Sequence, residues 1–229
     1  MDGVVTDTAS AHAAAWKRLF DEYLRRRAQR SGGEFTAFDI DGDFREYVDG
    51  KPRYDGVKSF LESRGIELPF GDPGDGPDTE TVCGLGNRKN RYFHAWLAEN
   101  RVRTYPSTIN LLRALRDAGI RTGMFASSRN GAAVLENAGI GELFDIKLDG
   151  VDLSELGMRG KPDPAMLFES AARLDAVPAR TAIVEDAISG VQAGSAGGFA
   201  PVIGVNRDDY GDALIARGEA TKELMASDR

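Results

Sequence analysis

The decisive stretch is Thr181-Ala182-Ile183-Val184-Glu185-Asp186-Ala187-Ile188-Ser189-Gly190. Its first four residues form a short, mainly apolar run, which predicts a buried strand that ends at an acidic pair. Small residues from Ile188 to Ala196 then predict a helix, and Pro201 to Val205 predicts a further strand. A strand, a helix and a second strand in this order predict a right-handed crossover between parallel strands.

The same alternation extends upstream. The apolar run Arg121 to Phe125 lies between Gly119 and a Ser-Ser-Arg-Asn-Gly turn, which predicts a buried strand that ends in a loop. The other elements predicted here are a strand at Phe144 to Leu148 and helices at Asn110 to Ala118, Ala132 to Ala138, Pro164 to Leu174 and Asp212 to Arg217, with no final strand after the last. We therefore expect an α/β fold with a doubly wound, mostly parallel, Rossmann-like sheet covered by helices on both faces.

The N-terminal part follows a different pattern. His12 to Gln29, Val57 to Arg64 and Asn87 to Glu99 each predict a helix, and the Pro- and Gly-rich stretch Pro69 to Pro77 predicts a long loop. We therefore expect a helical cap domain at residues 9–103, inserted into a core domain of residues 1–8 and 104–229.

Composition limits the classes of function. The chain has 229 residues, 41% of them hydrophobic, and a net charge of −7, which argues against nucleic-acid or anionic-membrane partners. The single cysteine, Cys83, excludes an internal disulfide and fits a reducing compartment. No apolar run approaches the roughly 20 residues of a membrane helix. These features favour a soluble, cytoplasmic protein.

Polar groups of complementary chemistry occur where strands of the core are predicted to end. They are Asp2-Gly3, the turn Ser127-Ser128-Arg129-Asn130, Lys161 before Pro162, and Glu185-Asp186. Open parallel sheets bind their ligands at this edge. A phosphoryl group needs a cation, hydroxyl or amide donors, and usually Mg²⁺ held by carboxylate oxygens. Each of these features alone is common in ordinary turns and at helix starts. Only their occurrence together, in this order at strand ends, indicates phosphoryl transfer.

These motifs resemble the haloacid dehalogenase superfamily, in its β-phosphoglucomutase-like branch. The resemblance rests on Asp2-Gly3-Val4-Val5-Thr6-Asp7-Thr8, Lys161-Pro162-Asp163-Pro164 and Glu185-Asp186-Ala187-Ile188-Ser189-Gly190, and it covers nearly the whole chain. It implies that Asp2 is a general acid and base whose main-chain carbonyl also binds Mg²⁺. It further implies that Glu185 and Asp186 complete the metal site, and that Lys161 neutralises the charge of nucleophile and phosphate.

The resemblance also assigns residues of the inserted cap. His12 matches a histidine that couples cap closure to proton transfer, Arg53 an arginine that grips the distal phosphate, and Lys89 a lysine over the active site. Considered alone, these would be a helix-start histidine, a loop arginine and a solvated lysine. Because a mutase must hold two phosphates and a guanidinium suits the second, Arg53 is the strongest cap candidate.

The sequence departs from the family pattern in two places. The nucleophilic Asp would stand two residues before Asp2, a position before Met1. We therefore expect the first strand of the sheet to be missing from the given sequence. A chain with this sequence is expected to be only marginally stable and to have little catalytic activity. In the phosphate-binding turn, alignment through Asn130-Gly131 puts the family's hydroxyl on Ala126, although a one-residue shift would use Ser127.

We expect a Mg²⁺-dependent sugar-phosphate mutase that interconverts β-glucose 1-phosphate and glucose 6-phosphate, or a phosphatase of the same superfamily. The joint presence of His12, Arg53 and Lys89 favours the mutase. A non-catalytic phosphate-binding module is the alternative that the missing nucleophile and Ala126 suggest. A phospho-accepting receiver domain is disfavoured by the helical insertion and by Glu185-Asp186 near the C-terminus.

Overall fold

The computed structural model describes residues 1–206 and 222–225 of the chain. They divide into two compact units. The core unit contains Met1–Thr8, Gly50–Pro52 and the described residues from Arg101 onward, and the cap unit contains Ala9–Asp49 and Arg53–Asn100.

Two short segments that the sequence assigned to the cap make their contacts in the core unit. The Ser127 hydroxyl donates a hydrogen bond of 2.8 Å to the carbonyl oxygen of Gly50. At the other segment, the backbone N–H of Val102 donates to the side-chain oxygen of Asn137 at 2.7 Å. The observed boundaries therefore differ from the expected 9–103 at both places.

The core unit contains only parallel strand pairs among its described residues. Strand β1 (Gly123–Phe125) pairs with β2 (Ile146–Leu148). In a second sheet, β3 (Ile183–Glu185) pairs with β4 (Val202–Asn206), and β4 with β5 (Lys222–Met225). The alternation therefore predicted the parallel α/β class and β1 to β4 correctly.

The expectation that no further strand follows β4 is wrong. The segment Lys222-Glu-Leu-Met carries no run of β-branched residues, and it becomes a strand through its backbone pairing with β4. The helix expected at Asp212 to Arg217 lies outside the described residues.

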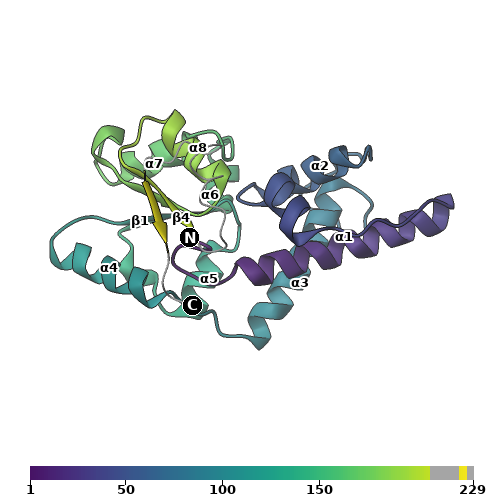
Figure 1. Ribbon diagram of the computed structural model, residues 1–229, viewed down its shortest axis with the longest axis horizontal. Coiled ribbons are helices and arrows are strands. Elements are labelled where there is room, and N and C mark those ends of the chain that lie inside the picture. The colour runs from purple at the N-terminus through teal and green to yellow at the C-terminus, as the bar shows by residue number, and fades with distance from the viewer. Residues whose placement is uncertain (207–221, 226–229) are drawn as a thin grey trace. The chain divides into compact units, whose positions relative to one another are not determined.

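Helices connect and cover the core strands (Figure 1). They are α4 (Pro106–Asp117), α5 (Gly131–Ala138), α6 (Gly150–Glu155), α7 (Ala165–Arg173) and α8 (Ile188–Ala196). Helix α7 packs on β1 and β2, and α8 packs on β3 and β4. The short helix α6, which the sequence analysis did not predict, begins at a capping box formed by Asp149 and Asp152.

The described residues contain no strand before β1. Instead, Met1–Thr8 forms a turn in which the carbonyl oxygen of Met1 accepts hydrogen bonds from the backbone N–H groups of Val4, Val5 and Thr6. Thr6 makes isolated bridges to Asp2 and Thr104.

The cap unit consists of α1 (Ala9–Ser31), a π-helix at Ile40–Val48, α2 (Arg53–Ser63) and α3 (Val82–Glu99). Helix α3 packs along α1, and α2 packs against α3 and the π-helix (Figure 1). Within the described residues, no helix has the length and apolar character needed to cross a membrane.

Helices α2 and α3 begin earlier than expected. At α3, a Cβ atom on Gly86 would lie 2.8 Å from the Tyr54 ring, so the absence of a side chain there allows close packing against the intrinsic preference of glycine. At α2, a Cβ atom on Gly56 would make only ordinary contacts, at 3.4 Å from Val48 and 3.5 Å from Trp16, so the space around Gly56 does not require glycine.

Buried aromatic rings form the centre of the cap. The centroid of Phe60 lies 4.1 Å from that of Phe20 and 5.0 Å from that of Phe38. All three side chains are fully or almost fully buried. Burial of such rings contributes strongly to the stability of this helical unit.

We predict that Phe60→Ala destabilises the cap by about 3–5 kcal/mol, because it leaves a cavity in this cluster. Phe70→Ala is the matched control, since Phe70 is 51% exposed, and we expect it to change the unfolding free energy by less than about 0.5 kcal/mol. Tryptophan fluorescence during urea unfolding measures both, because Trp16 and Trp96 lie in the cap. Equal losses for the two variants would contradict the prediction.

Candidate active site

The Asp2-Gly3 turn lies against the carboxylate of Asp186. The Thr8 hydroxyl donates a hydrogen bond to Oδ1 of Asp2, and the N–H of Gly3 donates to the Thr6 carbonyl at 2.8 Å. Gly3 has φ +68°, and a Cβ atom there would overlap the Asp186 carboxylate. The turn therefore requires glycine both for its backbone conformation and for this approach.

A buried ion pair joins Lys161 to the end of β3. The Nζ atom of Lys161 lies 2.5 Å from Oε1 of Glu185, and the two side chains are only 7% and 2% exposed. The other carboxylate oxygen of Glu185 accepts the backbone N–H groups of Asp186 and Ala187, each at 3.0 Å. The predicted Lys161 and Glu185 are thus brought together, and both oxygens of the carboxylate are engaged.

The charges around Glu185 keep it ionised. Burial by itself would raise the pKa of this carboxyl, but the Lys161 charge, the Met1 amino group and these hydrogen bonds hold the pKa below its usual value. The Met1 amino group also donates to the carbonyl oxygen of Phe125, at the end of β1, at 3.4 Å. The start of the printed sequence therefore lies beside the ends of β1 and β3.

The donors at this place are hard oxygen atoms, which fit Mg²⁺. Asp186 lies against the Asp2-Gly3 backbone, as the clash at Gly3 shows, and Glu185 precedes it in the chain. Among residues 1–206 and 222–225, no three His, Cys, Asp or Glu side chains are grouped to hold a metal ion. The predicted metal ligands are not a group of three side chains, because Asp2 is expected to bind the metal ion through its main-chain carbonyl oxygen.

The predicted phosphate turn follows β1. Ala126 donates its N–H to the Leu148 carbonyl at 3.0 Å and so continues the pairing of β1 with β2. The Ser127 hydroxyl hydrogen is directed to Gly50, whereas Oγ of Ser128 accepts the N–H of Asn130 at 3.2 Å. Asn130 is buried and Arg129 is exposed.

Two of the predicted cap residues lie together. The Nζ atom of Lys89 lies 2.6 Å from Nδ1 of His12. Because an ammonium group can only donate, Nδ1 is the acceptor and the neutral imidazole carries its proton on Nε2. Lys89 is buried, with its Nζ about 5 Å from the ring centroids of Trp16 and Phe93. Without the family resemblance, Lys89 was expected to be a solvated lysine, and this expectation is wrong.

Arg53 occupies a different part of the cap. It is the first residue of α2, and its Nη1 donates to Oδ1 of Asn87 at 3.0 Å. No sequence motif indicates a role for Asn87 or for Tyr54, whose hydroxyl donates to the same oxygen at 3.0 Å. Only the spacing of α2 against α3 brings these residues together, and no local pattern indicates it.

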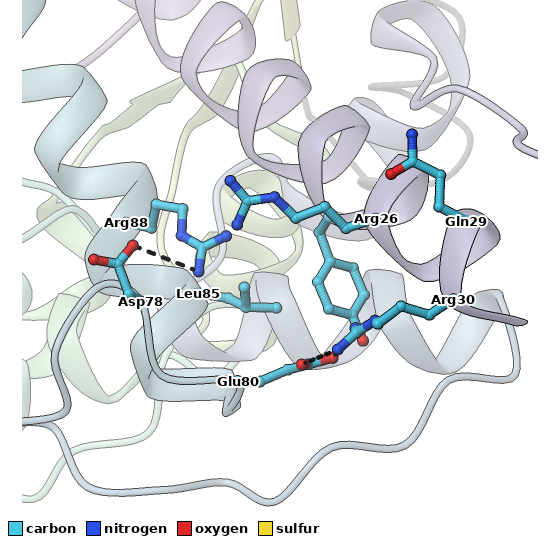
Figure 2. Close-up of a pocket in the computed structure, with 8 residues that line it drawn as sticks. Arg26, Gln29, Arg30, Asp78, Glu80, Leu85 and Arg88 are labelled. Atoms are coloured by element: carbon cyan, nitrogen blue, oxygen red, sulfur yellow. Dashed lines mark hydrogen bonds and ion pairs between the residues drawn. The ribbon is translucent and has the colours of Figure 1, made fainter.

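A groove of about 330 Å³ lies within the cap (Figure 2). Arg30 and Glu80 form a two-point ion pair across it at 2.6 and 2.8 Å, and the hydrogen bond from Arg30 lowers the pKa of Glu80. Figure 2 also shows Arg88 directed toward Asp78. The lining residues are Tyr23, Arg26, Gln29, Arg30, Asp78, Glu80, Leu85 and Arg88, and none is a predicted site residue. We interpret the ion pairs that line this groove as structural contacts, which attach residues 78–80 to α1 and α3.

Comparison with known proteins identifies the family. The haloacid dehalogenase-like hydrolase family matches residues 1–198. A β-phosphoglucomutase of Mycobacterium bovis is 46% identical over 90% of this chain and 79% of its own length, and one of Bacillus subtilis is 30% identical over 98% and 91%. The chain belongs to the haloacid dehalogenase-like hydrolase family, in its β-phosphoglucomutase-like branch.

The fold agrees with this assignment. A crystal structure of β-phosphoglucomutase from Clostridium difficile aligns with 99% of this chain and 88% of that chain, with a TM-score of 0.75 and 24% identity. The family has a Rossmann-like core with a cap, which is the fold class expected from the sequence.

We predict that Lys161→Met destabilises the core by about 3–5 kcal/mol, because it leaves the Glu185 carboxylate buried without its cation. The double variant Lys161→Met/Glu185→Gln should recover most of this loss, since the amide oxygen can still accept the N–H groups of Asp186 and Ala187. Chemical denaturation followed by circular dichroism measures both. A double variant no more stable than Lys161→Met would show that the buried charge is not the cause.

Proposed function

We propose that this protein transfers a phosphoryl group through an aspartyl phosphate and interconverts β-glucose 1-phosphate and glucose 6-phosphate. The observation that carries the proposal is the joint placement of the Lys161–Glu185 pair and the Asp186 carboxylate at the Asp2-Gly3 turn. The relatives named β-phosphoglucomutase, at 46% and 30% identity, support the choice of reaction.

Asp2 is proposed as the general acid and base. Its Oδ1 accepts the Thr8 hydroxyl, which orients the carboxyl group that is proposed to exchange a proton with a sugar oxygen. Protonation of the departing sugar oxygen, and later deprotonation of the attacking one, is the work that a mutase requires of this group.

The attacking carboxylate is proposed to belong to an Asp two residues before Asp2, a position that the printed sequence does not contain. The Met1 amino group donates to the Phe125 carbonyl oxygen at 3.4 Å, and Nζ of Lys161 lies 5.4 Å from the centroid of the Phe125 ring. A residue joined to Met1 is therefore proposed to emerge near Lys161, whose ammonium group can offset the charge of a carboxylate and a phosphate.

Mg²⁺ is the proposed cofactor, with the main-chain carbonyl of Asp2 and the carboxylates of Glu185 and Asp186 as its protein ligands. When bound, the ion neutralises charge on the transferring phosphoryl oxygens. Gly3 supports this set, since only a residue without a side chain lets Asp186 approach the Asp2 backbone.

The remaining residues are proposed to bind the substrate. Arg53 is assigned to the distal phosphate, for which a planar, permanently charged guanidinium is suited. Lys89, held by His12, supplies a second cap cation. In the core, the turn Ser127-Ser128-Arg129-Asn130 is assigned to the transferring phosphate, with Ser128 as the favoured hydroxyl.

The proposal is tested with an N-terminally extended form in which an Asp lies two residues before Asp2. With Mg²⁺ and a glucose bisphosphate primer, we expect it to interconvert the two glucose phosphates and to form an acid-stable, hydroxylamine-sensitive aspartyl phosphate. EDTA should abolish turnover, and Asp186→Asn should reduce it at least 100-fold, because one metal ligand loses its charge.

The printed sequence serves as the matched control, since it has no carboxylate at the added position, and we expect no aspartyl phosphate from it. Release of inorganic phosphate from sugar phosphates without interconversion would overturn the mutase assignment and leave a phosphatase. Phosphate binding without any turnover in the extended form would leave a non-catalytic module.

We also predict that Gly3→Ala weakens Mg²⁺ binding at least tenfold, because its Cβ displaces the Asp186 carboxylate. Gly139→Ala is the matched control. Gly139 has φ +69°, but no atom lies within 4 Å of the position that a Cβ would take there, so this variant reports backbone strain alone. Isothermal titration with Mg²⁺ measures both, and equal affinity of the two variants would remove Gly3 from the metal site.

A further inference from the structure

We propose that Asn87 is a positioning residue that fixes the direction of the Arg53 guanidinium and thereby sets preference for a doubly phosphorylated sugar. The inference rests on the proposed function, because it assigns to Asn87 a role exerted through Arg53. Its physical basis is a set of hydrogen bonds that leaves the Asn87 amide one orientation.

The two ends of the Asn87 side chain have different partners. Its Nδ2 donates to the carbonyl oxygens of Pro73 and Asp75, at 3.0 and 2.9 Å. Carbonyl oxygens cannot donate, so the NH₂ group must face them. Oδ1 consequently faces the other way, where it accepts Nη1 of Arg53 and the hydroxyl of Tyr54, each at 3.0 Å.

The packing under Arg53 restricts it further. The guanidinium carbon lies 5.6 Å from the centroid of the Tyr54 ring. A Cβ atom on Gly86 would come within 2.8 Å of that ring and 3.1 Å of Cδ of Arg53. The missing side chain of Gly86 therefore lets the arginine stem and the ring lie on the surface of α3, one residue before Asn87.

This arrangement lowers the entropic cost of binding a phosphate. An arginine side chain has several rotatable bonds, and their immobilisation on binding normally opposes association. Asn87 uses one of the five guanidinium N–H groups and fixes the plane of the other donors. A preorganised fork can engage two phosphate oxygens at once, which is geometrically specific in a way that a flexible arginine is not.

The test is a double-mutant cycle on the protein of residues 1–229, in which isothermal titration calorimetry measures binding in the presence of Mg²⁺. The measured quantity is the ratio of the affinities for glucose 1,6-bisphosphate and glucose 6-phosphate. We expect Asn87→Ala to lower the ratio about tenfold, as for loss of one hydrogen bond to a charged group. Arg53→Ala should lower it at least as much, and the double variant should equal Arg53→Ala.

Asn100→Ala is the matched control at the end of the same helix. It also loses a side-chain hydrogen bond, from Nδ2 to the Trp96 carbonyl at 2.8 Å, but it follows the last turn of α3, thirteen residues after Asn87, and we expect an unchanged ratio. If Asn87→Ala folds poorly by circular dichroism, Asn87→Ser replaces it. The serine hydroxyl can still donate to a nearby carbonyl oxygen, but it removes the amide that holds Arg53, so the ratio should again fall.

The possible failures are distinguishable. An unchanged ratio in Arg53→Ala, or equal wild-type affinities for the two sugars, would overturn the assignment of Arg53 in the proposed function. A ratio that falls in Arg53→Ala but is retained in the Asn87 variants would overturn the present inference alone. Additive losses in the double variant would also overturn it, because Asn87 would then act independently of Arg53.

Discussion

The ion pair between Lys161 and Glu185 is the interaction on which the core unit depends. Moving both charges out of water costs several kcal/mol for each, so neither side chain could be buried alone. Their 2.5 Å contact offsets this cost, together with the two backbone N–H groups that bind the second carboxylate oxygen. These hydrogen bonds also fix the backbone between β3 and α8, and therefore the position of the Asp186 side chain.

Close approach at glycine completes this arrangement. A Cβ atom on Gly190 would overlap the carboxylate of Glu185, so α8 can begin beside the buried pair only with glycine in its first turn. In the same way, the absence of a side chain at Gly3, in the N-terminal turn, leaves space for the Asp186 carboxylate. The motifs that identify the family are thus also packing requirements, because the charged groups need space as well as partners.

The sequence predicted the parts of the fold in which local pattern and tertiary structure agree. Apolar runs bounded by turns located β1 to β4, and the motif residues Lys161 and Glu185 do meet. The sequence did not predict the start of α3, where Gly86 is retained because a Cβ atom would lie too close to the Tyr54 ring. The π-helix Ile40–Val48 was also not predicted, and its start depends on the side chain of Asp39, which accepts the N–H groups of Asp41 and Gly42.

In the turn proposed to bind phosphate, spacing alone could not choose between adjacent residues, whereas their hydrogen bonds give a reason for preference. Ala126 uses its N–H in the pairing of β1 with β2, and it has no hydroxyl to offer. Ser127 directs its hydroxyl hydrogen to a carbonyl oxygen, so only its lone pairs remain. Ser128 accepts the N–H of Asn130, and this bond does not use its own hydroxyl hydrogen. A phosphate requires donors, and this requirement favours Ser128 over the two residues between which the alignment left the choice.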